Sequence, residues 1–328
     1  MRRLGFAASV AVVLAALALV PLPIVVYSPG DAESVPALVR IDGEEGEVSG
    51  DLLLTTVFQQ QASVVVALLG WIRDDEAVER ERDVLPPGID IEDYFADQRD
   101  VFAQSVEVAA AVGLQLAGRD IDIRGEGALI EGILPGSPAA AGLRVGDVIT
   151  AVDGDTIEFS VDLSEHTGAL AAGDTISVTV ERDGQYATVD LVLVDIPDLG
   201  RAGIGVSVST RNLTVELPVE VTAETDIGGP SAGLMLALTV YDLVDPVDLA
   251  AGRIVAGTGT IDLAGQVGNI GGIGMKVRGA AAAGATIFLA PAEQAEQARS
   301  AAPESMTVVG VSTADEAAAY LRGESVPT

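Results

Sequence analysis

The chain has 328 residues, which is enough for two or three compact domains. Its 18 basic and 49 acidic residues give a formal net charge of −31, so the surface repels phosphate backbones and nucleic-acid binding is not expected. There is no cysteine, which excludes disulfides, thiolate metal sites and cysteine nucleophiles. The single histidine, His166, cannot form a histidine-rich metal site alone, so we expect no metal and no cofactor.

The chain begins with a long apolar run. Residues 4–27 carry no charge and are numerous enough to cross a bilayer as a helix. Arg2 and Arg3 precede the run and acidic residues follow it, so the positive-inside rule predicts a cytoplasmic tip and transmembrane anchor over residues 1–27. The body then lies outside the cytoplasm, in a single-pass protein of the cytoplasmic membrane. A signal peptide cleaved near Ala16-Leu17-Ala18 is the alternative.

Residues 28–110 form an N-terminal region with mixed signals and no recognisable chemistry. Leu52 to Val57 favours a strand, and Glu92 to Ala110 favours a helix with one apolar side. Asp74 to Asp83 is rich in charges of both signs and predicts a solvated helix.

Short strands separated by glycines follow over residues 111–197. Their motifs, in chain order, are Gly136-Ser-Pro-Ala-Ala140, Gly142-Leu143, Gly146-Asp-Val-Ile149 and the alternating strand 174–180. In this order they resemble the PDZ domains of bacterial proteases. The resemblance implies a partly open β-barrel with two helices, which receives an extended peptide, often a protein C-terminus, as an added strand.

The loop that binds the peptide carboxylate is predicted at Val112, Gly113, Leu114 and Gln115. A carboxylate needs backbone N–H donors, and a glycine permits its close approach. The alternative is that Gly113 only opens a strand. His166 lies in the helix that borders such a groove, where we expect a solvated surface residue.

A serine near the start of an apolar helix is the first chemical signal. The stretch Asp226-Ile-Gly-Gly-Pro-Ser-Ala-Gly233 leads directly into Leu234 to Val244, which is too short to span a bilayer and predicts a buried helix. Pro230 suits the first helical position, which places Ser231 in the first turn. Unpaired N–H groups and the helix dipole there favour a nucleophilic oxygen and a developing oxyanion. A serine that only caps the helix is the alternative.

The second signal is Lys276, the only lysine among the 18 basic residues. It begins a helix of small residues after a glycine-rich stretch, so close packing is expected to bury its ammonium in part. Desolvation lowers the pKa of a lysine, and a neutral amine can accept a proton from serine. Arginine stays protonated and cannot do this. A genome that favours arginine explains the scarcity of lysine, but not the one lysine that remains.

These stretches together resemble the proteolytic domain of the Lon proteases over residues 203–320. The motifs that carry the resemblance are Gly229-Pro-Ser-Ala-Gly233, Thr258-Gly259, Gly268-Asn-Ile-Gly-Gly272 and the lysine beyond them. The resemblance implies an α/β proteolytic domain over residues 198–328, with Ser231 as nucleophile and Lys276 as general base. It also implies that Thr258 helps to orient the lysine, and that the chains assemble as a homo-hexamer.

One position departs from the pattern of the ATP-dependent Lon enzymes. They commonly carry an acidic residue three positions before the serine, where this chain has Gly228; the nearest carboxylate is Asp226. The chain also has no phosphate-binding loop motif with its lysine, so we expect proteolysis without ATP, directed at unfolded or loosely structured proteins.

The combination resembles the membrane-anchored, PDZ-containing Lon-like proteases of Gram-positive bacteria. The predicted fold class is therefore an α+β multi-domain protein with an N-terminal transmembrane helix, a PDZ domain and a C-terminal Lon-type domain. The strand near residues 50–57 is expected to join the protease sheet, with the PDZ domain inserted between. We expect a serine endopeptidase whose PDZ domain recognises or gates protein substrates. The alternatives are a membrane-tethered PDZ adaptor with an inactive Lon-like domain, and a sensor of protein C-termini that does not cleave.

Overall fold

The chain divides into two compact units, which we describe separately. Unit 1 comprises residues 1–120 and 219–328, and unit 2 comprises the intervening residues 121–218. The first limit lies beyond the predicted 110 because the helix from Ile91 to Leu116 continues past that residue within unit 1. The second lies beyond the predicted 197 because residues 206–210 and 214–216 pair with strands of unit 2. The computed structural model describes residues 21–41, 49–73, 75–85, 91–196, 201–217, 221–223, 227–245 and 247–324.

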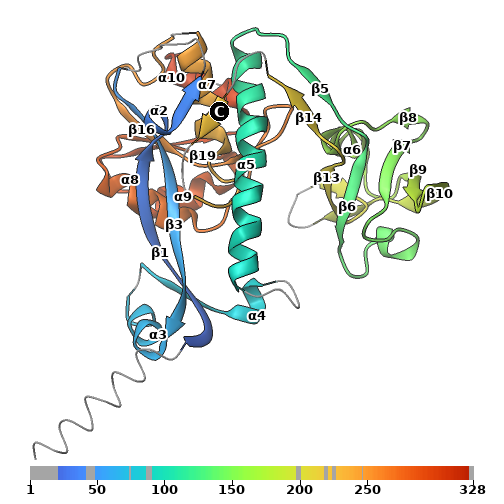
Figure 1. The fold of residues 1–328 in the computed structure, drawn as a ribbon, viewed down its shortest axis with the longest axis horizontal. Coiled ribbons are helices and arrows are strands. Elements are labelled where there is room, and N and C mark those ends of the chain that lie inside the picture. Colours follow the sequence, from blue (N-terminus) through green and yellow to red (C-terminus); the bar gives the residue numbers. More distant parts are fainter. Residues whose placement is uncertain are drawn as a thin grey trace, which may run out of the picture. The chain divides into compact units, whose positions relative to one another are not determined.

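Unit 1 is a mixed α/β unit (Figure 1). Its strands are β1 (Pro21–Ser34), β2 (Val39–Ile41), β3 (Asp51–Ser63), β4 (Ala77–Arg80), β15 (Val221–Ala223), β16 (Ile254–Gly257), β17 (Thr260–Ile261), β18 (Val267–Gly268), β19 (Ile287–Pro291) and β20 (Thr307–Val311). Its helices are α2 (Val35–Leu38), α3 (Val64–Gly70), α4 (Glu81–Val84), α5 (Ile91–Leu116), α7 (Gly233–Val244), α8 (Ile273–Ala282), the 3₁₀ helix η2 (Ala292–Gln294), α9 (Ala295–Ala301) and α10 (Ala314–Leu321).

The main sheet of unit 1 has the strand order β20-β19-β16-β3-β1-β4. Strands β20, β19, β16 and β3 run parallel, whereas β1 is antiparallel to both β3 and β4. Leu52, Leu53 and Leu54 of β3 are all buried, as expected for a strand covered on both faces. Leu53 packs in one apolar cluster with α8 and α9, so β3 joins N-terminal residues to the C-terminal half of the chain.

Helix α7 is buried in all directions. Its sequence Gly-Leu-Met-Leu-Ala-Leu-Thr-Val-Tyr-Asp-Leu-Val is apolar around the whole circumference, which suits a helix surrounded by protein. It packs against the long helix α5 and also contacts β3 and β16. The residues at its start are therefore held in place from several sides.

A close approach between α8 and β1 fixes the position of α8. A Cβ atom at Gly279 would lie 2.5 Å from the carbonyl oxygen of Gly30 in β1. Glycine is required here because no other side chain fits between the two backbones. The contact seats α8 on the sheet and sets where the residues of its first turns lie.

Unit 2 is built on a second sheet, with the order β10-β9-β7-β6-β13. Its elements are β5 (Asp122–Arg124), β6 (Ala128–Ile133), the 3₁₀ helix η1 (Pro138–Ala141), β7 (Val148–Val152), β8 (Asp155–Thr156), α6 (Ser160–Gly168), β9 (Thr175–Arg182), β10 (Gln185–Val192), β11 (Val194–Ile196), β12 (Arg201–Gly203), β13 (Val206–Thr210) and β14 (Thr214–Glu216). A separate apolar core, with Ile130, Ile149 and Ile176 fully buried, lies within this unit. Strand β13 forms one edge of the sheet.

The predicted N-terminal transmembrane helix is wrong where the structure describes it. Pro21–Tyr27 belong to strand β1, and Val25 and Val26 are buried in the sheet of unit 1. The apolar character of this part therefore serves a buried strand. None of the helices in the described ranges combines the length and the apolarity that a bilayer-spanning helix needs. Residues 1–20 of the predicted anchor lie outside the described residues.

The charged stretch from Asp74 to Asp83 also differs from the prediction of one helix. Ala77–Arg80 pair with β1 as strand β4, and only the following turn, α4, is helical. The many charges of the segment favoured a solvated helix, whereas backbone pairing with β1 makes residues 77–80 a strand.

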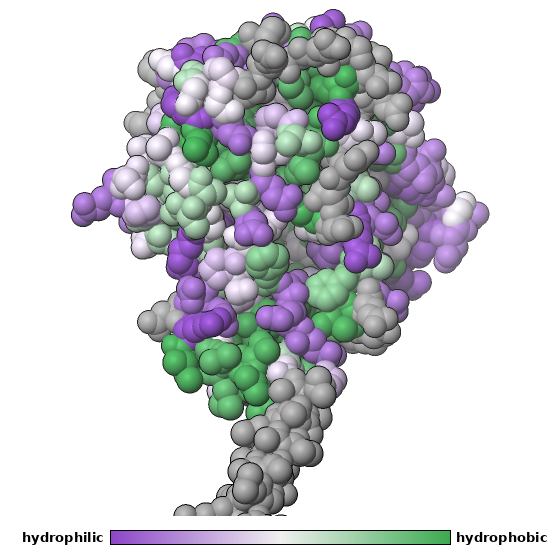
Figure 2. Space-filling model, turned by 60° about the vertical axis from the view of Figure 1, so that its left-hand side comes forward, coloured by the Kyte–Doolittle hydropathy of each residue, from purple (hydrophilic) through white to green (hydrophobic). Residues whose placement is uncertain are grey.

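Apolar side chains gather on the surface over α3. Leu68, Leu69, Trp71 and Ile72 are all exposed, with Trp71 at 66% and Ile72 at 77%. Figure 2 shows this apolar area on the end of unit 1 that holds α3. Clusters of this kind are uncommon on protein surfaces that contact only water.

Replacing Gly279 tests the approach of α8 to β1. Gly279→Ala is expected to lower the free energy of unfolding by about 1–3 kcal/mol, because the added methyl group forces α8 or β1 to shift. Gly274→Ala is the matched control in the same helix, since its Cβ would meet no atom closer than 3.6 Å. Urea unfolding followed by circular dichroism measures both. An equal loss of unfolding free energy in the two variants would contradict the close packing of α8 against β1 at Gly279.

Candidate functional site

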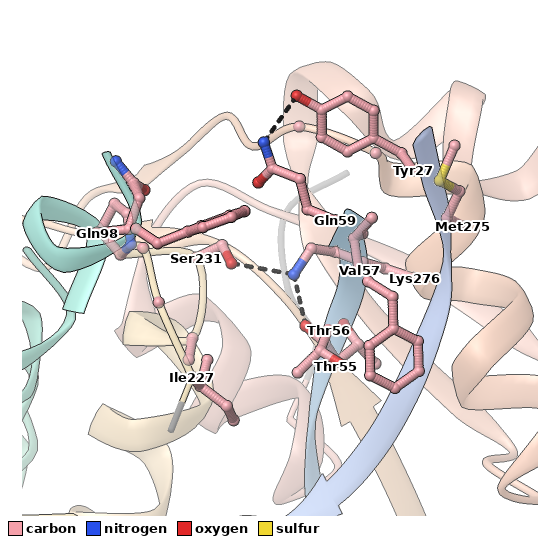
Figure 3. Close-up of a pocket in the computed structure, with 18 of the residues that line it drawn as sticks. Tyr27, Thr55, Thr56, Val57, Gln59, Gln98, Ile227, Ser231, Met275 and Lys276 are labelled. Carbon is pink, nitrogen blue, oxygen red and sulfur yellow. Dashed lines mark hydrogen bonds between the residues drawn. The ribbon is translucent and has the colours of Figure 1, made fainter. Parts of the chain in front are cut away.

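Ser231 and Lys276 meet at the centre of unit 1. Ser231 lies just before α7, and Lys276 lies in α8. The Lys276 Nζ atom is 3.0 Å from the Ser231 Oγ atom, as drawn in Figure 3. The structure therefore brings together two residues that are 45 positions apart in the sequence.

The Lys276 amine is removed from water and from acidic partners. Its residue is 4% exposed, and none of the ion pairs within the described residues involves it. Its Nζ atom donates to the carbonyl oxygen of Thr55 at 2.5 Å. Burial lowers the pKa of Lys276 from 10.5 to about 8, because desolvation disfavours the ammonium form. At pH 7 roughly a tenth of this amine is then neutral and available as a base, far more than for a lysine of ordinary pKa.

Thr55 belongs to β3 and was not among the predicted site residues. Its side-chain hydroxyl donates to the carbonyl oxygen of Gly257 at 3.2 Å, which ties β3 to the end of β16. Its backbone carbonyl is the group that holds Lys276. Every residue has a backbone carbonyl, so the residue type at position 55 could not predict this contact with Lys276. The sequence predicted only that a strand lies near this position.

Thr258 has a different contact from the one expected. Its hydroxyl donates to the carbonyl oxygen of Ser231 at 3.0 Å, and the N–H of Gly259 donates to the same oxygen at 2.9 Å. Among the described residues, Lys276 forms its hydrogen bonds with Ser231 and Thr55 instead. Thr258 is buried and holds the backbone of the serine, whereas the Thr55 carbonyl orients the lysine.

A cavity of about 1000 Å³ opens beside the pair. Strand β3 and the segment from Ile227 to Ala232 both line it, together with residues of β1, β4, α2, α5 and the start of α8. The residues labelled in Figure 3 are Tyr27, Thr55, Thr56, Val57, Gln59, Gln98, Ile227, Ser231, Met275 and Lys276. The cavity is large enough for several residues of a peptide.

The loop before Ser231 is fixed to α5. The N–H of Gly229 donates to the carbonyl oxygen of Gln98 at 2.8 Å, and Gly229 has a positive φ of 82°. At Gly228, where an acidic residue is common in ATP-dependent Lon enzymes, a Cβ atom would lie 3.0 Å from the Cβ of Gln98. A carboxylate side chain at Gly228 would therefore require the loop to move. Asp226 lies outside the described residues.

Two backbone N–H groups near the serine are candidates for an oxyanion site. Ser231 and Ala232 both line the cavity and immediately precede α7. Within the described residues, neither N–H donates to a backbone carbonyl. Ser231 therefore lies one residue before the N-cap rather than in the first turn as predicted, and free donors beside a helix N-terminus suit a developing negative charge.

The predicted carboxylate-binding loop at Val112, Gly113, Leu114 and Gln115 is a helix instead. All four residues lie in α5, where Val112 and Leu114 are buried. A Cβ atom at Gly113 would lie 2.5 Å from the carbonyl oxygen of Ala237 in α7. The glycine therefore serves helix packing, and these four residues form no open cradle for a carboxylate.

A segment with the expected features of such a loop lies in unit 2, directly before β13. Gly203 and Gly205 flank Ile204, and Gly205 has a positive φ of 77°. The carbonyl groups of Ile204 and Gly205 accept from Ala139 and Leu134, whereas in the described region their N–H groups donate to no backbone carbonyl. The edge strand β13 follows and contacts α6. Two glycines just before an alternating strand are the sequence signal that could have indicated this segment.

His166 lies on α6 between two carboxylates. Its Nε2 atom is 3.2 Å from Asp153 and its Nδ1 atom is 3.8 Å from Asp155. The side chain is partly buried rather than fully solvated. Among the described residues no group of three or more His, Cys, Asp or Glu side chains is placed to hold a metal ion.

Comparisons with known proteins match one part of the chain to a known family. Residues 105–193 match the family model described as "PDZ domain". A "Probable periplasmic serine endoprotease DegP-like" of Pseudomonas savastanoi is 38% identical over 104 residues, which are 30% of this chain and 22% of that protein. The protein of the same name from Halomonas elongata is 32% identical over 127 residues, 38% of this chain and 26% of that protein. The chain thus spans about a quarter of the length of these relatives or less.

Solved structures also match about a quarter of the chain. The PDZ domain of the SdrC-like protein from Listeria monocytogenes is 26% identical and covers 25% of this chain and 87% of that chain, with a TM-score of 0.24. A solution structure from Geobacillus thermodenitrificans is 35% identical and covers 25% of this chain and 95% of that chain, with a TM-score of 0.23. From the match to the family model, the chain contains a PDZ domain and is similar in part to PDZ-containing serine endoproteases.

Proposed function

We propose that the chain is a Lon-like serine endopeptidase that works with a Ser-Lys dyad and without ATP. The observation that carries the proposal is the buried amine of Lys276, with its lowered pKa, 3.0 Å from the hydroxyl of Ser231. The motifs around both residues, and the similarity to serine endoproteases, support the same class of reaction.

In the first step, the neutral amine of Lys276 accepts the hydroxyl proton as Ser231 Oγ attacks the scissile carbonyl carbon. The Thr55 carbonyl accepts one N–H of the amine and so directs the nitrogen lone pair toward the serine. Lys276 then returns the proton to the leaving amine, which breaks the peptide bond and leaves an acyl-enzyme. Water attacks the ester with Lys276 again as base, and the free Ser231 is restored.

Two sets of groups assist the proposed reaction: one holds the serine, and the other stabilises the charge that develops on the substrate. Thr258 and Gly259 both donate to the carbonyl oxygen of Ser231, which fixes the peptide that carries the nucleophile. The N–H groups of Ser231 and Ala232 are the proposed donors to the oxyanion. Because these groups are in place before substrate arrives, little reorganisation is needed during the reaction.

The PDZ domain is proposed to select protein substrates by their C-termini. The peptide would add as a strand beside β13, with its carboxylate on the N–H groups of the Gly203–Gly205 segment. The Gly203–Gly205 segment thus takes the role that the sequence had predicted for Val112 to Gln115, which lie in α5. Assembly as a homo-hexamer and the cellular location stay predictions.

Substitution of the dyad tests the proposed reaction. With casein as substrate and no ATP, Ser231→Ala and Lys276→Arg are each expected to lower the rate about 1000-fold or more, since each removes one half of a coupled unit. Ser300→Ala is the matched control, because its hydroxyl only contacts Glu296 on an exposed helix. Equal cleavage by all four proteins would contradict the dyad. No cleavage by the unmodified chain would favour the alternative of a PDZ adaptor with an inactive domain.

The pH dependence of cleavage tests the state of Lys276. The active form is the neutral amine, so kcat/KM should rise with pH and level off above the lysine pKa of about 8. The initial rates of the full chain on a casein-derived peptide, from pH 6 to pH 10, measure this profile. A rise centred near 10.5, the ordinary pKa of lysine, would show that burial does not activate the amine.

A further inference from the structure

We propose that the part of the cavity around Tyr27 and Glu79 binds a basic side chain of the substrate, an arginine or a lysine. This inference rests on the proposed peptidase function and specifies which substrates that site selects. It follows from the kinds of side chain that line the cavity and from their distance to the dyad.

Aromatic residues are concentrated in this cavity. The whole chain has six phenylalanines, five tyrosines and one tryptophan. Four of these aromatic residues line the cavity, namely Tyr27, Phe58, Tyr94 and Phe95. The rings of Tyr94 and Phe95 are tilted against each other, with their centres 5.9 Å apart. The faces of aromatic rings attract cations, and guanidinium groups stack on them especially well.

The charged groups of the cavity also favour a cation. Glu33 and Glu79 are its two carboxylates, and no arginine is among the described residues that line it. Neither glutamate takes part in an ion pair within the described residues. The amine of Lys276 is held by Thr55 and Ser231 instead. A basic group of the substrate can therefore pair with a carboxylate that the chain itself leaves without a cation.

The pairing of β1 with β3 and β4 brings three of these side chains to one face of the sheet. Tyr27 of β1 lies opposite Gln59 of β3 and opposite Ala77 of β4. Glu79 follows Ala77 by two residues, so its side chain lies on the same face as that of Tyr27. The Nε2 atom of Gln59 donates to the hydroxyl oxygen of Tyr27 at 3.1 Å, as drawn in Figure 3. We call Tyr27, Gln59, Glu79 and Tyr94 the aromatic subsite.

The pKa of the Tyr27 hydroxyl agrees with this grouping. Burial raises it to about 12, and the negative charge of Glu79 and the neighbouring Tyr94 add to the effect. A charge shifts the pKa of another group in this way only when the two are near each other. The carboxylate of Glu79 and the rings of Tyr27 and Tyr94 are thus close enough to surround one bound cation.

The distance from the dyad determines which substrate residue the aromatic subsite holds. The carbonyl of Thr55 binds Lys276, and Gln59 follows Thr55 by four residues on β3, which corresponds to about 13 Å. An extended peptide covers that distance in about four residues, and a long basic side chain shortens it further. We therefore expect the basic residue about three or four positions from the cleaved bond. Directly beside the bond, the charged form of Lys276 disfavours a second cation.

A set of peptides tests the preference for a basic residue. The full chain is given one casein-derived peptide in which each position on either side of the cleaved bond carries, in turn, Arg, Met or Glu. Three or four positions from the bond, on one side of it, Arg should raise kcat/KM about three- to tenfold over Met, and Glu should lower it. Equal kcat/KM for the three residues at every position, with cleavage still dependent on Ser231, would overturn the aromatic subsite and leave the peptidase standing. No cleavage of any peptide would overturn the proposed function and this inference together.

The substitution Glu79→Gln tests the aromatic subsite from the side of the enzyme. It removes the charge and keeps the shape, so the ratio of kcat/KM for the Arg peptide to that for the Met peptide should fall close to one. Both values come from the same preparation, so a loss of folded enzyme does not change the ratio. An unchanged ratio in Glu79→Gln would overturn the inference.

Glu304→Gln is the matched control for this variant. Glu304 is exposed and does not line the cavity, so its substitution should leave the ratio as it is in the unmodified chain. An equal fall of the ratio in both variants would show that the general negative charge of the protein attracts the Arg peptide. That result would overturn the aromatic subsite while cleavage itself continued.

Discussion

The proposed chemistry of this protein depends on one amine held out of water between a carbonyl and a hydroxyl. The Nζ atom of Lys276 forms hydrogen bonds with Thr55 and Ser231. Within the described residues it forms no ion pair with a carboxylate. A buried ammonium without an acidic partner is costly, so the neutral amine becomes accessible near neutral pH. An aspartate or glutamate at this place would favour the charged form and remove the base.

The fold of unit 1 supplies three elements that meet at this amine. Helix α8 is seated on β1 by the contact between Gly279 and Gly30, which sets the location of Lys276. Helix α7, buried on all sides, presents Ser231 just before its first turn. Strand β3 provides the Thr55 carbonyl and, further on, an edge without a partner among the described strands. One strand from the N-terminal part of the chain thus contributes to the proposed activation of the base.

The residue types of Ser231 and Lys276 indicated the candidate dyad, whereas the backbone groups that hold the two residues in place could not be predicted from the sequence. Ser231 and Lys276 were indicated by a helix start and by a single lysine in a chain rich in arginine. The carbonyl of Thr55 has no such signature, because every residue carries one. The contact of Thr258 with the Ser231 backbone likewise depends on how β16 ends beside α7.

Two predictions failed because apolar sequence suits more than one buried structure. The apolar residues from Pro21 to Tyr27 fit a membrane helix by hydropathy, but in the structure they begin strand β1, which lies between β3 and β4. The residues from Val112 to Gln115 were assigned to a loop because of one glycine, which instead allows α5 to pack against α7. In both cases tertiary packing decided between structures that local sequence left open.

The most direct test of this account is the titration of Lys276 itself. Because the chain has a single lysine, selective ¹³C,¹⁵N labelling of lysine gives one side-chain signal in an NMR spectrum without further assignment. The account predicts a pKa of about 8 for that amine in the folded protein. A titration near 10.5 would show that the amine stays charged at neutral pH, and would contradict its role as the base.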